Sequence, residues 1–154
     1  MSSKTRFEPR DPDYRDKVAK SFALQTVMNT MGINLNSVRA GEVELSMDHR
    51  DAYTQQHGFI HAGVTATALD SACAYAAFSL MAPEAAVLTV EFKTTLITPA
   101  DGERFIYRGR VLKPGKTLTY TEGSAWAVQG DQETLVATMT ATIMALYGRS
   151  HLRL

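Results

Sequence analysis

The sequence predicts an α+β fold, in which an antiparallel sheet of about six strands curves around one long central helix. Residues 63–82 contain no proline and a single charge, Asp70, and their apolar and small side chains lie on every side of a helical wheel, as in a buried helix. After Pro83 the apolar residues recur at every second position, which is the period of a strand. The central helix is therefore expected in the concave side of the sheet.

A separate N-terminal helix is expected over residues 12–31, after about eleven residues (1–11) that we expect to be disordered. Asp11, Pro12 and Asp13 are typical of a helix start, because they combine a capping side chain with a proline in the first turn. Apolar residues then recur at spacings of three and four, and Gly32 supplies the stop. The helix is amphipathic, so it should flank the core.

The predicted core covers residues 33–147 and begins with a hairpin that turns at 39–41. A polar, glycine-containing loop over 48–60 then leads into the central helix. After that helix, turn residues at 99–102, 113–116 and 130–131 separate four further strands. In the first of these, one face is expected to carry four large apolar residues, Leu88, Val90, Phe92 and Leu96.

Length and composition indicate a single domain over residues 1–154, and they narrow the range of partners. Sixteen basic and sixteen acidic residues cancel, so we expect neither nucleic acid nor a membrane surface as a partner. Cys73 is the one cysteine and the N-terminus lacks an apolar signal segment, which favours the cytoplasm. His57 and His61 lie four apart, but a His-Glu-x-x-His motif is missing, so no metal site is expected.

Several short motifs follow one another in the order of a known family. They are Gln56 to His61 before the helix, His61-Ala62-Gly63 with Asp70 nine residues after the histidine, Thr89-Val90-Glu91-Phe92, Ile97 to Ala100, Gly109-Arg110-Val111 and Pro114-Gly115-Lys116. With these motifs, about residues 31–146 resemble the hotdog-fold thioesterases, and among them the phenylacetate-degradation (PaaI-like) group that acts on acyl-CoA.

The resemblance implies a hotdog fold and hydrolysis of an acyl-CoA thioester to a free acid and coenzyme A. Asp70 would be the nucleophile or the general base, and the backbone N–H of Ala62, at the helix start with Gly63, would hold the oxyanion. Gln55, His61 and Thr89 would assist in positioning. Ala62 stands where the family usually has a glycine, and Gln55 stands where it commonly has an asparagine. An alanine still supplies the N–H. An alternative that does not depend on the resemblance is a purely structural role for Asp70, with its carboxylate hydrogen-bonded to Ser71, Thr67 or a backbone group.

A distance argument predicts at least a homodimer. Asp70 lies eight residues beyond Ala62, which is on the order of 12 Å along one helix, whereas a reacting carbon must lie about 3 Å from both groups. Two chains are therefore needed, with paired half-sites about a two-fold axis. The resemblance implies the same arrangement, and we expect the dimers to pair into a homotetramer.

The coenzyme A part of the substrate needs cations for its phosphates. Five cations without an intervening acid run from Arg104 to Lys116, and the candidates are Arg108, Arg110, Lys113 and Lys116. A solvated face is an equally good explanation of this run. Tyr75 is a candidate for the acyl slot, and no cofactor is expected apart from coenzyme A within the substrate.

The acyl group stays open between arylacetyl, aromatic and medium-chain types. Two other functions of the same fold also stay open: an acyl-CoA-binding protein without turnover, and an enoyl-CoA hydratase or dehydratase. The latter is disfavoured because the sequence has no His-Phe-Pro type entry to the helix.

Overall fold

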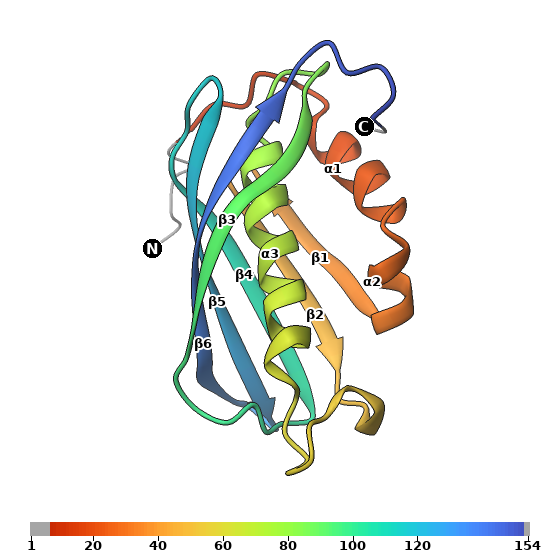
Figure 1. Ribbon diagram of the computed structural model, residues 1–154, viewed down its shortest axis with the longest axis vertical. Coiled ribbons are helices and arrows are strands. Elements are labelled where there is room, and N and C mark those ends of the chain that lie inside the picture. Colours follow the sequence, from red (N-terminus) through yellow and green to blue (C-terminus); the bar gives the residue numbers. More distant parts are fainter. Residues whose placement is uncertain (1–6, 153–154) are drawn as a thin grey trace.

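Six antiparallel strands form one curved sheet around a long helix, α3, in the computed structural model, which describes residues 7–152 (Figure 1). The predicted α+β class and the central position of the helix are confirmed. In chain order the elements are α1 (Tyr14–Ala23), α2 (Thr26–Met31), β1 (Ile33–Arg39), β2 (Glu42–Asp48), the 3-10 turn η1 (Asp51–Tyr53), α3 (Ala62–Phe78), β3 (Ala86–Leu96), β4 (Arg104–Lys113), β5 (Leu118–Gln129) and β6 (Gln132–Leu146).

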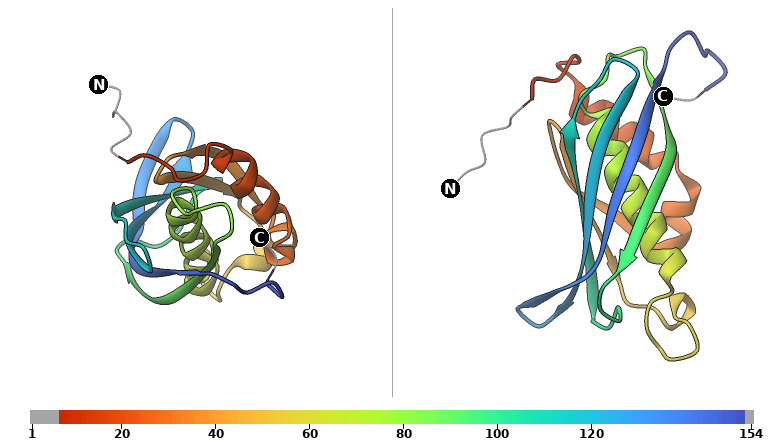
Figure 2. Two further views of the ribbon diagram at one scale, coloured as in Figure 1. Left: turned by 90° about the horizontal axis from the view of Figure 1, so that it is seen from above. Right: turned by 60° about the vertical axis from the view of Figure 1, so that its left-hand side comes forward.

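The strand order is β1-β2-β4-β5-β6-β3, so β1 and β3 form the two edges of the sheet. Seen end-on, the sheet curves around α3 while α1 and α2 lie along another side of that helix (Figure 2). The connection from β2 to β4 spans α3 and β3, which brings β3 to the far edge beside β6. This topology leaves one edge of β3 without a neighbouring strand.

Two glycines allow α3 to approach the sheet closely. Gly109 of β4 and Gly123 of β5 are paired in register beneath the helix. A Cβ atom on Gly109 would lie 2.3 Å from the backbone of Ala72, and one on Gly123 would lie 2.9 Å from Sγ of Cys73. The small residues on both sides of this contact explain why an alanine-rich helix forms the centre of the core.

The helix expected over 12–31 consists of two helices, because Gln25 has an extended backbone (φ −77°, ψ 97°). The break lets its side chain reach α3. There its amide donates a 3.1 Å hydrogen bond to the Tyr75 hydroxyl, and its carbonyl accepts one of 3.2 Å from Ser71. Asp11 was expected to cap the helix with its side chain, but the N-cap of α1 is Asp13. The Asp11 carboxylate instead accepts the Asp13 N–H and forms an ion pair with Lys17.

Helix α3 ends at Phe78, so the expected extension to residue 82 is wrong. After Phe78 the backbone continues in short turns, in which the N–H groups of Leu80 and Met81 donate to carbonyls three residues back, and tertiary contacts hold this segment in place. The Ser79 hydroxyl donates to the carbonyl of Ala76 and accepts the N–H of Gly41, each at 2.7 Å. The carbonyls of residues 81 and 82 accept hydrogen bonds from the Lys17 ammonium group.

Strand β3 differs most from the sequence-based expectation. A bulge at Val90 interrupts its register with β6, so the apolar residues before and after it no longer alternate on one common face. All four are about half exposed: Leu88 52%, Val90 52%, Phe92 47% and Leu96 59%. The edge strand therefore presents an apolar surface that this chain does not cover.

Residues 7–11 belong to the segment expected to be disordered, and they pack against the end of α3. The Arg10 N–H donates to the carbonyl of Leu80, and Asp11 is buried. Residues 1–6 lie outside the described residues. Within residues 7–152, none of the helices has the length and apolar character needed to cross a membrane. The predicted cytoplasmic location stays a prediction.

Candidate active site

Asp70 and Thr89 are brought together where α3 meets the edge strand β3. The Thr89 hydroxyl donates a 2.7 Å hydrogen bond to Oδ1 of Asp70. Burial raises the pKa of Asp70 above its ordinary value, and the hydrogen bond from Thr89 opposes this shift. One carboxylate oxygen is thus oriented by Thr89, while Oδ2 has no hydrogen-bond partner within residues 7–152.

Asp70 lies on a half-open stripe of a helix that is otherwise buried. From Thr65 onward, the residues of α3 that are partly exposed are Ala66, Thr67, Asp70 and Ala74, at spacings that keep them on one side. Their side chains are small apart from Asp70. The carboxylate therefore faces an open surface beside β3 and is not sealed in the interior.

The alternative in which neighbouring hydroxyls hold Asp70 is wrong. The Ser71 hydroxyl donates to Gln25, and the Thr67 hydroxyl donates to the carbonyl of Gly63. Neither group is available to Asp70 as a donor, so a purely structural role for this acid rests on Thr89 alone.

The first turn of α3 presents a free backbone donor. His61 is the N-cap, and its Nδ1 accepts a 2.9 Å hydrogen bond from the N–H of Gly63. The N–H of Ala62 has no partner in the described part of the chain, as is usual for the first residue of a helix. Ala62 has a negative φ, so an alanine fits here without strain.

A hollow of about 530 Å³ lies against this helix start, between the 55–62 loop and the segment that follows β3. Its lining includes Gln55, His61 and Ala62. The Gln55 side-chain carbonyl accepts the N–H of His57, which leaves its NH₂ group as a donor without a partner among the described residues. The structure therefore brings these three predicted residues together.

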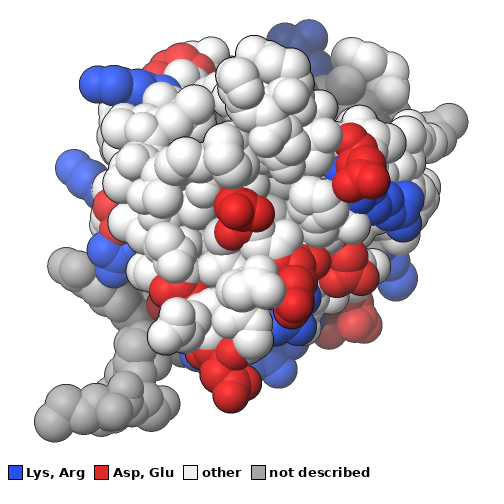
Figure 3. Space-filling view, turned by 90° about the horizontal axis from the view of Figure 1, so that it is seen from below, with Lys and Arg blue, Asp and Glu red and all other residues white. Residues whose placement is uncertain are grey.

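The opposite wall of the hollow was not predicted from the sequence. It is formed by apolar and small residues from the end of β3, the β3–β4 connection and β6, namely Leu96, Ile97, Thr98, Pro99, Ala100, Val136 and Ala137. The motif Ile97 to Ala100 was part of the resemblance but carried no chemical group that would mark it as a site. Uncharged side chains make up most of this end of the molecule (Figure 3). Such a lining suits an acyl group.

Within one chain the two halves of the site stay apart. Neither Asp70 nor Thr89 lines the hollow. Ala62 and Asp70 lie on the same uninterrupted helix, so about 12 Å of helix axis separates them. One copy of the chain cannot place a single carbonyl carbon against both groups.

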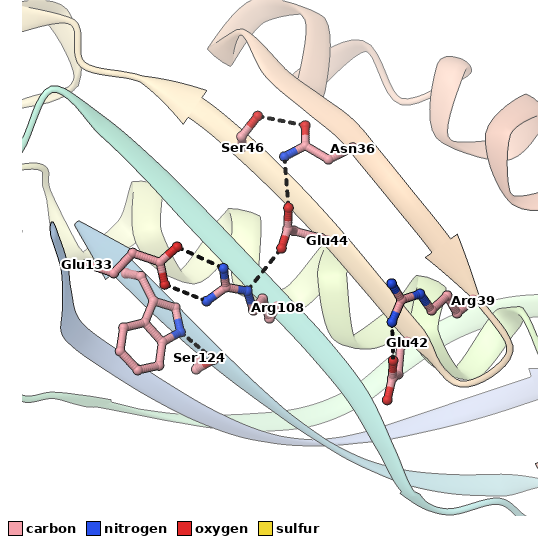
Figure 4. A network of polar contacts seen from close by, with 9 residues as sticks. Asn36, Arg39, Glu42, Glu44, Ser46, Arg108, Ser124 and Glu133 are labelled. Atoms are coloured by element: carbon pink, nitrogen blue, oxygen red, sulfur yellow. Dashed lines mark hydrogen bonds and ion pairs between the residues drawn. The ribbon is translucent and has the colours of Figure 1, made fainter. Parts of the chain in front are cut away.

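Arg108 and Arg110 lie on the face of the sheet that points away from α3, and both are paired with acids. The contacts of Arg108 are shown in Figure 4. Arg108 donates to Glu44 at 3.0 Å and binds both carboxylate oxygens of Glu133, at 2.8 and 2.9 Å. These hydrogen bonds, chiefly those with Glu133, raise the pKa of Arg108. Arg110 is paired with Glu122. Acids from other strands therefore already neutralise both guanidinium groups.

The other predicted substrate residues also lie away from the hollow. The turn that holds Lys113 and Lys116 lies at the end of α3 opposite Ala62 (Figure 1), where Pro114 and Gly115 border a small hollow with Leu80. Neither lysine forms an ion pair within residues 7–152.

Tyr75 is 2% exposed and lies beneath the N-terminal helices. Its hydroxyl is bonded to Ser21 and Gln25, and burial raises its pKa. Its assignment to the acyl slot stays a prediction, as do the basic residues proposed for coenzyme A.

The fold and the helix-start hollow define a hotdog-type thioesterase domain, and comparisons with known proteins agree. Residues 57–134, half of the chain, match the sequence model of the Thioesterase superfamily. The chain belongs to this superfamily, which confirms the resemblance predicted from the motifs.

A crystal structure of a thioesterase family protein from Silicibacter pomeroyi is 56% identical and has a TM-score of 0.86, covering 88% of this chain and 99% of that one. Human acyl-coenzyme A thioesterase 13 is 35% identical over 92 residues, which cover 58% of this chain and 64% of the human protein. The match thus spans less than two thirds of that relative. The PaaI protein of Escherichia coli shares the fold, with a TM-score of 0.77 at 18% identity over 88% of this chain and 95% of that one.

Proposed function

We propose that the protein hydrolyses acyl-CoA thioesters to a free acid and coenzyme A, at sites shared between two copies of the chain. The observation that carries this proposal is Asp70: a carboxylate of raised pKa in an otherwise apolar helix, held by Thr89 and open on one side. A group perturbed in this way at an open surface is typical of a catalytic site. Membership of the thioesterase superfamily supports the same chemistry.

The exposed edge of β3 supports a homodimer. An unpaired edge strand with half-exposed Leu88, Val90 and Phe92 is a ready surface for a second copy. Thr89, near the start of β3, contacts Asp70, whereas Leu96, at its end, lines the hollow. If two β3 strands pair antiparallel about a two-fold axis, Asp70 of one copy approaches the hollow of the other. Pairing of dimers into a tetramer stays part of the proposal.

In this arrangement the carboxylate and the oxyanion donor act on one carbonyl group from two chains. As a general base, Asp70 takes a proton from water while the oxygen attacks the thioester carbon. As a nucleophile, its carboxylate attacks that carbon directly and forms a mixed anhydride, which water then hydrolyses to release the free acid and restore Asp70. In both cases the C–S bond breaks and the thiolate of coenzyme A leaves. The Ala62 N–H, at the positive end of the α3 dipole, stabilises the negative oxygen that forms on the carbonyl.

For the phosphates of coenzyme A, Lys113 and Lys116 are better candidates than Arg108 and Arg110, because the arginines are already paired with acids. The two-fold arrangement brings opposite ends of the two copies together. The lysines of the chain that supplies Asp70 would then lie at the same end as the hollow of its partner.

Thiol release from a panel of arylacetyl-, aryl- and alkyl-CoA esters tests the proposal, with wild type and Asp70→Asn measured side by side. Release by wild type and its loss in the variant are expected. Equal rates in both proteins would remove Asp70 from the mechanism, and binding of the esters without release would identify a non-catalytic acyl-CoA-binding protein.

A further inference from the structure

One buried hydroxyl group of the core has no hydrogen-bond partner. Tyr107 of β4 is 0% exposed, and its hydroxyl forms no hydrogen bond within residues 7–152. Buried hydroxyl groups are nearly always bonded, because leaving one unpaired costs free energy. Tyr107 points into the core beneath α3, and a phenylalanine would fill the same space without the unpaired group. The unpaired hydroxyl group is therefore a candidate for binding a ligand.

The hollow at the start of α3 lies next to this hydroxyl. Thr65 of α3 lines the hollow, and its side chain lies close enough to the Tyr107 hydroxyl to oppose the effect of burial on the pKa of Tyr107, although the two groups do not meet the geometry of a hydrogen bond. On the sheet side, Tyr107 pairs in register with Ala125, Ala125 with Ala137 and Ala137 with Leu96, and the last two also line the hollow. Two consecutive alanines, with small side chains, therefore separate Tyr107 from Leu96 in this row.

We propose that the hydroxyls of Thr65 and Tyr107 form the polar far end of the acyl pocket and select short acyl groups that end in a hydrogen-bonding atom. This inference rests on the proposed function, because it assumes that the acyl group enters the hollow from the Ala62 N–H. An ω-hydroxyl, a carbonyl or an amide at the far end of the acyl group supplies the partner that the Tyr107 hydroxyl lacks.

The position of Thr65 sets the length of the acyl group. Thr65 lies three residues after Ala62 on α3, about 4.5 Å along the helix axis. A carbonyl group held at Ala62 is therefore within the length of a few methylene groups from the two hydroxyls. A long saturated chain would have to place methylene groups against the unpaired hydroxyl, which disfavours it.

The test uses two acyl groups of the same length and shape, ω-hydroxyhexanoyl and heptanoyl, which differ by a hydroxyl in place of a methyl group. Hydrolysis of the two CoA esters gives a ratio of kcat/KM values, and binding of the corresponding non-hydrolysable CoA thioethers gives a ratio of Kd values. Wild type is expected to favour the hydroxylated group by about fivefold to tenfold in both ratios. Tyr107→Phe is expected to reduce both ratios to about one and to leave the melting temperature unchanged or higher.

Three further variants control the experiment. Tyr120→Phe removes the hydroxyl of a half-exposed tyrosine on β5, and both ratios should stay at the wild-type value. Thr65→Val should lower the ratios and Thr65→Ser should restore them, because serine keeps the hydroxyl. Wild-type ratios in Tyr107→Phe would overturn the inference, and a lower melting temperature together with those ratios would assign the hydroxyl to folding. Failure of the proposed function is a separate result: without any hydrolysis, the thioether Kd ratio still decides the role of Tyr107.

Discussion

The hydroxyl of Thr89 donates a 2.7 Å hydrogen bond to Oδ1 of Asp70, and this bond joins the edge strand to the central helix. It determines which carboxylate oxygen is free, and it partly offsets the effect of burial on the pKa of Asp70. Thr89 thus points toward α3, and the bulge at Val90 follows it directly along β3. The contact therefore links the titration of Asp70 to the shape of β3.

The pH dependence of hydrolysis should follow the ionisation of the Asp70 carboxyl group. The ionised carboxylate is the active form, so kcat/KM should fall as the pH drops through a pKa above the ordinary value of 3.8. Thr89→Val removes a hydrogen bond that favours the ionised form, so the acid limb of the profile should move to higher pH. A profile of the variant that coincides with wild type would show that Thr89 does not tune the reacting group.

The stability of the protein should also report the burial of Asp70. Its folded-state pKa lies above the unfolded value, so ionisation favours the unfolded state, and this loss of stability appears as the pH rises from about 3.8 through the folded-state pKa. Below that window both states are protonated and the acid contributes nothing. Asp70→Asn should therefore be more stable than wild type at neutral pH. The difference in free energy of unfolding should shrink as the pH is lowered to about 3 to 4, near the pKa of an aspartate in the unfolded state. Denaturant titrations at both ends of this range measure the effect.

The oxyanion role of Ala62 can be tested by removing its N–H alone. Ala62 is the first residue of α3, where proline is well tolerated, and His61 before it has an extended backbone (φ −59°, ψ 139°) that suits a following proline. Ala62→Pro should keep the fold and lower kcat by about 10²- to 10³-fold. Ala62→Gly, which keeps the N–H, is the matched control and should stay within a fewfold of wild type. Unchanged turnover in Ala62→Pro would exclude this donor.

Complementation between two inactive variants tests the shared site. Each mixed dimer of Asp70→Asn and Ala62→Pro contains one site with both defects and one intact site. Random pairing makes about half of the dimers mixed, so co-expressed protein should recover about one quarter of wild-type activity. Recovery should disappear when both substitutions are placed on the same chain and mixed with either single variant. A site within one chain would give no recovery in any mixture.

The contact that fixes the N-terminal segment to the end of α3 should be important for stability. Lys17 forms a 3.5 Å ion pair with Asp11, the side chains being 10% and 8% exposed, and it lies 4.6 Å from the centre of the Phe78 ring. Its ammonium group also donates to two carbonyls beyond α3. Lys17→Met leaves the buried acid without its cation and the Met81 carbonyl without its donor, and should lower the free energy of unfolding by about 2 to 4 kcal/mol.

Lys20→Met is the control for this experiment, because Lys20 lies on the same helix and is exposed. Its effect should stay within about 0.5 kcal/mol. Denaturant unfolding of the two variants compares them directly, and equal effects would show that the Lys17 contacts are not stabilising.

The sequence alone determined the fold class, the central helix and the acid within it. These features depend on local period and composition: an alanine-rich segment without a polar face forms a buried helix, and alternating residues form strands. The separation of Ala62 and Asp70 along one helix also follows from their spacing, and the structure places both on α3.

Only the tertiary structure decided which groups are free. Arg108 and Arg110 were candidates for phosphate because no acid lies near them in the sequence, but Glu44, Glu122 and Glu133 reach them from other strands. The bulge at Val90 and the unpaired hydroxyl of Tyr107 likewise depend on strand register and packing between segments far apart in the chain. Local sequence carries no signal for such contacts, because they form only when the sheet closes around α3.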